Sequence, residues 1–101
     1  PAIIHTTTSS HGWTLLHMAS SGGNAHLVDL LIRRGSNVNS QNVYGKTALH
    51  YAATKGHVKI VKLLLKNGAN SELLFEGKSA LEHAIANDQH EVAELLKVAN
   101  A

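Results

Sequence analysis

Eight histidines in a chain of 101 residues raise the question of metal or catalytic chemistry. Imidazole nitrogens bind zinc and act as general bases. Helical metal sites require fixed ligand spacings such as His-Glu-x-x-His. No histidine pair in this sequence has such a spacing, and no cysteine is present to supply a thiolate. We therefore expect no metal site and no cofactor, and structural or incidental roles for the histidines.

Catalytic motifs are also missing from the sequence. It contains no Gly-x-Ser-x-Gly elbow, no phosphate-binding loop and no dinucleotide fingerprint. The glycine-containing stretch 21–24 has the composition of a turn between helices. These observations predict that the chain is not an enzyme.

The aromatic residues are a second group of candidate functional residues, and their chemistry is suited to binding another protein. The chain has only four of them, Trp13, Tyr44, Tyr51 and Phe75. Aromatic side chains are enriched at the energetic centres of protein interfaces because they offer a large apolar area with few rotatable bonds. Whether these four lie together depends on the elements that carry them.

Those elements repeat along the chain. The segment 12–19, Gly-Trp-Thr-Leu-Leu-His-Met-Ala, recurs at 45–52 and, more weakly, at 77–84. The two offsets are 33 and 32 residues. A period of this length predicts a solenoid, in which each unit buries its apolar face against its neighbours.

The second unit shows the pattern of one repeat most clearly. Thr47 is an expected N-cap, and the first helix then extends to about Lys55. A turn at 56–57 leads to a second helix, Val58 to Lys66, whose apolar residues recur at helical spacing. Gly68 is expected to end that helix in the left-handed conformation.

Extended loops should follow each helix pair, at residues 36–44 and 69–76. The second loop contains the one-residue deletion, which a loop tolerates better than a helix does. In the third unit Asn100 takes the place of the terminating glycine, and we expect it to adopt the same left-handed conformation.

The three units resemble the ankyrin repeat family, whose 33-residue units carry a Thr-Pro-Leu-His-x-Ala signature. The resemblance covers roughly residues 9–101. The signature proline is replaced by Leu15, Ala48 and Ala80, the signature histidine by Glu82 in the third unit, and a turn glycine by Asp88. We expect the last two changes to weaken the third unit locally.

The resemblance implies an all-α fold, a solenoid of three stacked helix-turn-helix repeats with projecting β-turn or finger loops. The expected organisation is a frayed N-terminal segment, 1–8, and one ankyrin-repeat domain, 9–101. Its repeats would span about 9–41, 42–73 and 74–101.

In ankyrin-like arrays the finger loops and first helices form a concave surface that contacts other proteins. The resemblance thus implies a non-catalytic protein-protein interaction module, with all four aromatic rings on that surface. The expected partner-binding residues are Trp13, Met18, Tyr44, Lys46, Tyr51, Lys55, Phe75 and Lys78.

The charge distribution bears on the partner. Residues 33–70 carry seven Lys or Arg and no acid, whereas residues 71–101 carry two lysines and six acids. A surface with both rings and lysines suits an acidic, partly apolar protein or peptide. The lysine row 59, 62 and 66 fits a solvated helix face, so we expect no nucleic-acid binding.

Other features bear on location and assembly. No apolar run approaches the ~18 residues of a membrane span, and the absence of cysteine fits a reducing compartment. We expect an intracellular, cytoplasmic or nuclear, monomer without membrane contact. Alternative functions are a regulatory or docking segment of a larger enzyme or channel, a small stand-alone ankyrin-type inhibitor, or a structural spacer.

Asn39 is a candidate modification site. In ankyrin-like proteins, an asparagine that follows Val and lies eight residues beyond Leu can be hydroxylated by an intracellular hydroxylase. Leu31, Val38 and Asn39 have this spacing. The structural alternative is that Asn39 only binds backbone groups in its loop.

Overall fold

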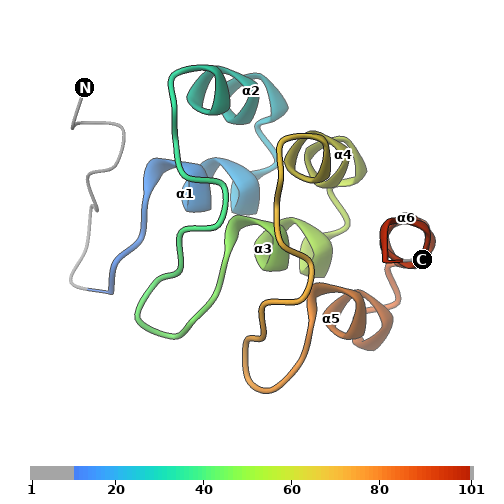
Figure 1. Cartoon of the computed structure of the whole chain (residues 1–101). Helices are drawn as coiled ribbons and strands as arrows, with labels where there is room; N and C mark the ends of the chain where they lie inside the picture. Colours follow the sequence, from blue (N-terminus) through green and yellow to red (C-terminus); the bar gives the residue numbers. More distant parts are fainter. Residues whose placement is uncertain (1–10, 101) are drawn as a thin grey trace.

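The computed structural model of the protein describes residues 11–100, which form three helix pairs stacked side by side (Figure 1). The helices are α1 (Leu15–Gly22), α2 (Ala25–Arg33), α3 (Ala48–Lys55), α4 (Val58–Lys66), α5 (Ala80–Ala86) and α6 (His90–Ala99). The all-α repeat fold and the bounds of the two helices in the middle unit are confirmed. The expected segment 1–8 lies outside the described residues.

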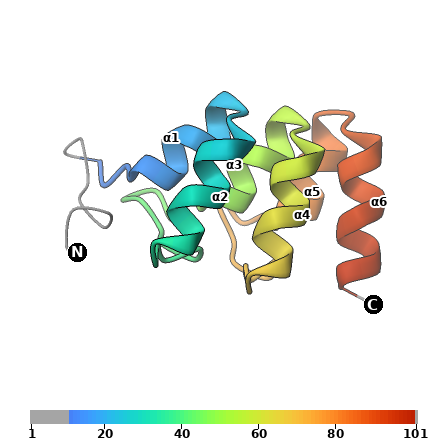
Figure 2. The ribbon, with the colours of Figure 1, turned by 90° about the horizontal axis from the view of Figure 1, so that it is seen from above.

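The helices form two layers. Inner helices α1, α3 and α5 pack against one another in one layer, and outer helices α2, α4 and α6 form the other (Figure 2). Loops joining α2 to α3 and α4 to α5 project beyond the inner layer as two fingers, and we call them the first and second finger loops (Figure 1). The stack is thus built from one repeated unit.

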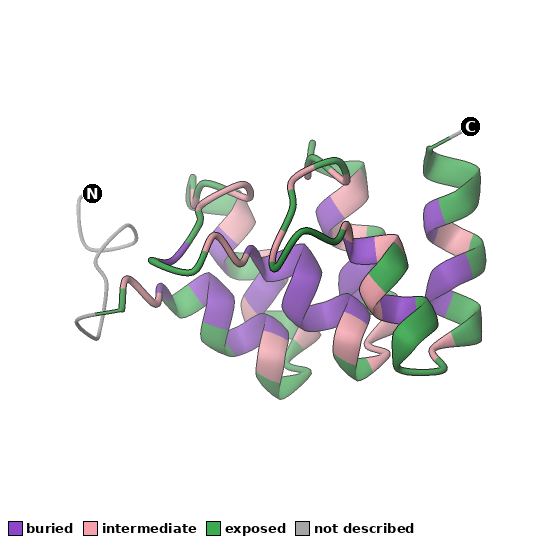
Figure 3. Ribbon diagram, turned by 90° about the horizontal axis from the view of Figure 1, so that it is seen from below, coloured by how far each residue is buried: buried purple, intermediate pink, exposed green. Residues whose placement is uncertain are grey.

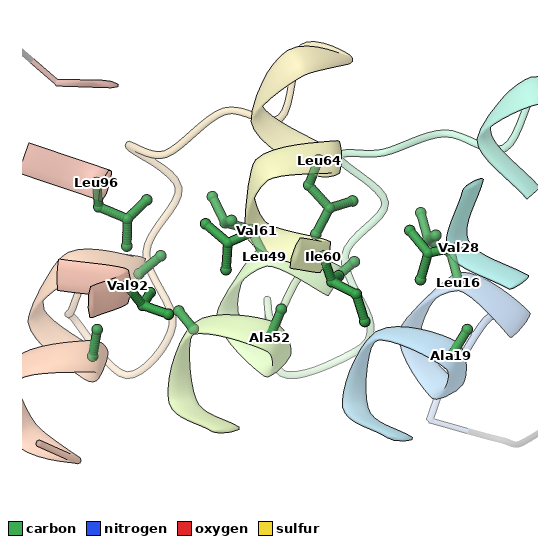
Figure 4. Packing of buried hydrophobic residues seen from close by; sticks show 14 of the residues in the cluster. Leu16, Ala19, Val28, Leu49, Ala52, Ile60, Val61, Leu64, Val92 and Leu96 are labelled. Atoms are coloured by element: carbon green, nitrogen blue, oxygen red, sulfur yellow. The ribbon is translucent and has the colours of Figure 1, made fainter. Parts of the chain in front are cut away.

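The core lies between the two layers and runs through every repeat (Figure 3). In the middle repeat, Leu49 of α3 meets Ile60, Val61 and Leu64 of α4, all at most 1% exposed (Figure 4). Burying a side chain of this kind contributes about 1.5–3 kcal/mol. Burial that continues from repeat to repeat is what holds the stack together.

Each inner helix begins with a capping box. The Thr14, Thr47 and Ser79 side chains accept a hydrogen bond from the backbone N–H three residues later. In the third repeat, Glu82 Oε1 accepts from Ser79 N at 2.9 Å, as the histidines do in the other two. Glu82 therefore keeps the helix cap; that the third repeat is locally weaker stays a prediction.

The outer helices end differently in the third repeat. Gly35 and Gly68 have φ of +92° and +91°, so the left-handed ending expected at Gly68 is confirmed. Asn100, in contrast, has φ −89° and ψ −3°, a right-handed conformation. That expectation is wrong; the Asn100 side chain instead accepts a hydrogen bond from Ser71 Oγ in the second finger loop.

Hydrogen bonds join adjacent repeats near the turns between inner and outer helices. His57 Nε2 lies 3.2 Å from Ser21 O, and Gln89 Nε2 donates to Thr54 O at 3.1 Å. Both side chains pass over a glycine of the preceding repeat, Gly23 or Gly56. The turn thus needs glycine for its left-handed φ and for this close approach.

The one-residue deletion lies at the tip of the second finger. The first tip has three residues between Asn42 and Lys46, whereas the second has only Glu76 and Gly77 between Phe75 and Lys78. Phe75 and Lys78 exchange backbone hydrogen bonds of 2.9 and 3.1 Å. Both turn residues have positive φ, +54° and +74°, as in a type I′ turn.

Glu76 is poorly suited to this turn because a glutamate side chain disfavours the left-handed conformation. Replacing Glu76 with Asn gives the Asn-Gly pair that type I′ turns prefer. We expect Glu76→Asn to raise the free energy of unfolding by about 0.5–1 kcal/mol. Urea unfolding of the two proteins measures this difference, and unchanged or lower stability of the variant would contradict the turn assignment.

Candidate functional site

Asn42 organises the tip of the first finger loop. Its side-chain oxygen accepts hydrogen bonds from Tyr44 N at 3.1 Å and Lys46 N at 3.0 Å. Its amide nitrogen donates to the Tyr51 hydroxyl at 2.8 Å. Asn42 is only 5% exposed, and it therefore fixes the finger to helix α3. Asn42 is not among the residues expected from the sequence.

A hollow of about 530 Å³ opens between the two finger tips and the inner helices. Its lining defines what we call the aromatic patch: Trp13, Tyr44, Lys46, Tyr51, Phe75 and Glu76. The Trp13 and Tyr51 ring centroids lie 4.7 Å apart. The ring of Tyr44 stacks on His11 at 5.6 Å. Residues from three segments distant in sequence thus form one surface.

Lys46 lies in the middle of the aromatic patch. Its Nζ atom is 4.2 Å from the Tyr51 ring centroid and 4.7 Å from that of Phe75. Both distances are within the range of cation–π attraction. Burial lowers the pKa of Lys46; the negative charge of Glu76 opposes this shift, and the positive charge of Lys55 adds to it.

The structure brings five of the eight expected partner-binding residues into this patch. Trp13 and Phe75 are half-buried, and Tyr44 is 56% exposed. Tyr51 lines the hollow as expected but is only 6% exposed, so a direct contact of this ring with a partner stays a prediction. Its hydroxyl bonds Asn42 and its ring lies against Trp13 and Lys46, which places it at the floor of the hollow.

The remaining three expected residues, Met18, Lys55 and Lys78, are exposed but do not line the hollow. Glu76 lines it and was not among the expected residues. The deletion in the second finger was visible in the sequence, but the resulting two-residue turn that places Glu76 beside Lys46 was not.

A comparison with protein-family models decides the family. The model for ankyrin repeats in three copies matches residues 16–101. The chain belongs to the ankyrin repeat family. A comparison with curated proteins gives no match for this ankyrin domain.

Ankyrin repeats in general are protein-protein interaction modules, and the family is typically non-catalytic. Within residues 11–100, no group of three or more His, Asp or Glu side chains is arranged to hold a metal ion. No helix in that range is both long and apolar enough to cross a membrane.

The signature histidines of the ankyrin domain have structural contacts. His17 Nδ1 accepts from Thr14 N at 3.0 Å, and its Nε2 lies 2.8 Å from Ser40 O in the first finger loop. His50 Nδ1 accepts from Thr47 N at 3.2 Å. Burial, and then the nearby His83, lower the pKa of His50 to about 4.

This shift predicts a pH-dependent stability of the ankyrin domain. Between the pKa of about 6.5 of an unfolded histidine and about 4 in the fold, the unfolded chain takes up a proton that folded His50 does not. The free energy of unfolding should therefore fall as the pH drops through this window, by about 2 kcal/mol at pH 5 relative to neutral pH.

The variant His50→Gln tests this source of pH dependence. Glutamine can accept from the Thr47 N–H as in a standard capping box, but it does not titrate. We expect a smaller fall in stability between pH 6.5 and 4 than in the unmodified protein, measured by urea unfolding at each pH. Parallel pH profiles of the two proteins would show that His50 is not the source.

Asn39 of the ankyrin domain connects the two finger loops. Its amide nitrogen donates to Gly68 O at 3.1 Å, and its side-chain oxygen accepts from Asn70 N at 2.6 Å. These contacts are the backbone bonds that the structural alternative predicts. Hydroxylation of Asn39 stays a prediction.

Proposed function

We propose that this ankyrin domain is a non-catalytic recognition module that binds another protein through the concave side formed by its finger loops and inner helices. The observation that carries this proposal is the hollow of about 530 Å³ lined by aromatic rings from three segments. A concave site lined by aromatic side chains together with a few polar groups is typical of a binding site. A hollow of this size accepts one or two side chains of a partner.

The patch has the chemistry of a binding hot spot. Tyr44 is exposed, Trp13 and Phe75 are half-buried, and their positions are fixed by packing within the stack. Side chains that are already ordered lose little entropy on binding, so more of the contact energy contributes to affinity. The exposed Met18, Lys55 and Lys78 would extend the contact beyond the hollow.

The partner proposed for this surface is an acidic, partly apolar protein segment. Lys46 lies in the patch, and Lys55 and Lys78 are exposed on the same proposed surface, whereas the lining of the hollow includes one acid, Glu76. Basic surfaces of this kind favour acidic partners and speed their association. Under this proposal the domain acts as a monomer.

Affinity capture with matched variants tests the proposed function. The immobilised domain is exposed to extract from its own cells, and the proteins it retains are compared with those retained by Tyr44→Ala and by Lys62→Ala. Tyr44 is in the patch, whereas Lys62 is exposed on the outer helix α4. We expect Tyr44→Ala to lose a partner that Lys62→Ala keeps; equal retention by both variants would contradict the proposal.

A further inference from the structure

The ammonium group of Lys46 has no acceptor among the residues described. It contacts the faces of Tyr51 and Phe75, and no hydrogen bond or ion pair from its Nζ to an oxygen is formed within residues 11–100. The side chain is half-buried, and Glu76 lines the same hollow without coming into ion-pair contact. An ammonium group carries three donors, and two ring faces satisfy none of them as an oxygen does.

The surroundings also fix the position of this charge. Two ring faces hold the Lys46 side chain, which enters the hollow from the organised tip of the first finger. The half-buried position over two ring faces reduces the water around the ammonium, and this burial lowers the Lys46 pKa. A positioned, partly desolvated cation interacts more strongly with an incoming anion than a mobile surface lysine does.

Glu76 competes with such an anion for the positive charge of Lys46. It lines the same hollow, and its negative charge raises the Lys46 pKa against the effect of burial. An incoming carboxylate therefore has to approach Lys46 against the repulsion of Glu76. Removing the Glu76 charge should strengthen binding of the anion.

We propose that Lys46 determines the specificity of the aromatic patch by binding an Asp or Glu side chain of the partner, whose neighbouring apolar side chain occupies the ring-lined hollow. Glu76 weakens that contact by competing for Lys46. This inference rests on the proposed function and adds to it the residue that recognises the partner's acid. The carboxylate belongs to an internal segment of the partner.

Selection from a phage-displayed library of random twelve-residue peptides tests the inference. Displayed peptides are fused at their carboxyl end, so an acidic preference reports side chains and not a free terminus. We expect the unmodified domain to select Asp or Glu next to an apolar residue. Lys46→Met keeps the aliphatic chain over the rings and should lose this preference, whereas Lys62→Met, on the exposed side of α4, should keep it.

A selected peptide and its Asp→Asn or Glu→Gln counterpart then give the size of the effect. Trp13 is the only tryptophan and lines the hollow, so its fluorescence reports binding there. We expect the unmodified domain to bind the acidic peptide at least about fivefold more tightly than the neutral one. For Lys46→Met, the affinities for the two peptides should differ by less than about twofold. Glu76→Gln should tighten binding of the acidic peptide about two- to threefold. Circular dichroism and urea unfolding establish that each variant is folded.

The outcomes separate this inference from the proposed function. If selected peptides depend on Tyr44 but show no acidic preference, or if Lys46→Met keeps that preference, the role of Lys46 is wrong while the binding surface stands. If no selected peptide changes Trp13 fluorescence or depends on Tyr44, the proposed binding surface itself is wrong.

Discussion

Replacing Gly56 with alanine should destabilise the domain by about 2–3 kcal/mol, a large effect for the addition of one methyl group. Gly56 has φ +77°, a left-handed conformation that disfavours any Cβ atom by about 1–2 kcal/mol. A Cβ at this position would also collide with the Gln89 side-chain oxygen. If Gln89 moves away, its hydrogen bond to Thr54 O is lost, and that contact joins two repeats.

Gly22 provides the matched control. It lies at the end of α1, its φ is not in the left-handed range, and no atom lies within 4 Å of a Cβ added there. Gly22→Ala should therefore leave stability unchanged or raise it by up to ~1 kcal/mol. Urea unfolding measures both variants. A Gly56→Ala protein within about 0.5 kcal/mol of the unmodified one would contradict this account of the turn.

A double-mutant cycle separates the two causes. Gln89→Ala alone removes the contact over Gly56 and should reduce stability by about 1 kcal/mol. In the Gln89→Ala background, Gly56→Ala should be less damaging, because only the backbone strain remains. Purely additive effects would show that strain alone explains the glycine.

Loss of partner binding in a Trp13→Ala, Tyr44→Ala double variant is the second large effect that we expect. Each ring at an interface centre contributes more than ~1 kcal/mol, so the double variant should bind at least about tenfold more weakly. Tyr44 is 56% exposed and can be removed without opening the core. Trp13 contacts Tyr51 and His17, so its removal requires a stability control.

The control variant is Lys62→Ala on the exposed side of α4. We expect it to bind as tightly as the unmodified domain, as measured by titration calorimetry with the captured partner. Single variants at Trp13 and Tyr44 distinguish a shared effect from one dominant ring. Similar losses in Lys62→Ala and the double variant would show that the contact is not centred on the finger side.

The repeat pattern made most of the fold predictable. Period, capping residues and apolar spacing placed helix α4 at Val58–Lys66 and its cap glycine at Gly68, because these features depend on nearby residues. Asn100 was mispredicted: it keeps a right-handed conformation at the end of α6. Its side chain accepts a hydrogen bond from Ser71, a contact between different repeats that the local sequence pattern does not show.

The site was only partly predictable. The repeat predicted that Trp13, Tyr44 and Phe75 lie near one another, because each precedes an inner helix at a similar position in its repeat. It did not show that Asn42 would bond the Tyr51 hydroxyl, which holds that ring at the floor of the hollow. Nor did it show that a shortened turn would bring Glu76 beside Lys46. Both depend on side-chain contacts across different segments, which the repeat period does not encode.

Site-specific photo-cross-linking tests the binding surface most directly. A photoreactive phenylalanine derivative replaces either Tyr44 in the aromatic patch or Lys62 on α4, and each domain is irradiated with the captured partner. The account predicts efficient cross-linking from position 44 and little or none from position 62. Cross-linking from position 62 alone, with none from position 44, would place the partner on the outer helices and contradict it.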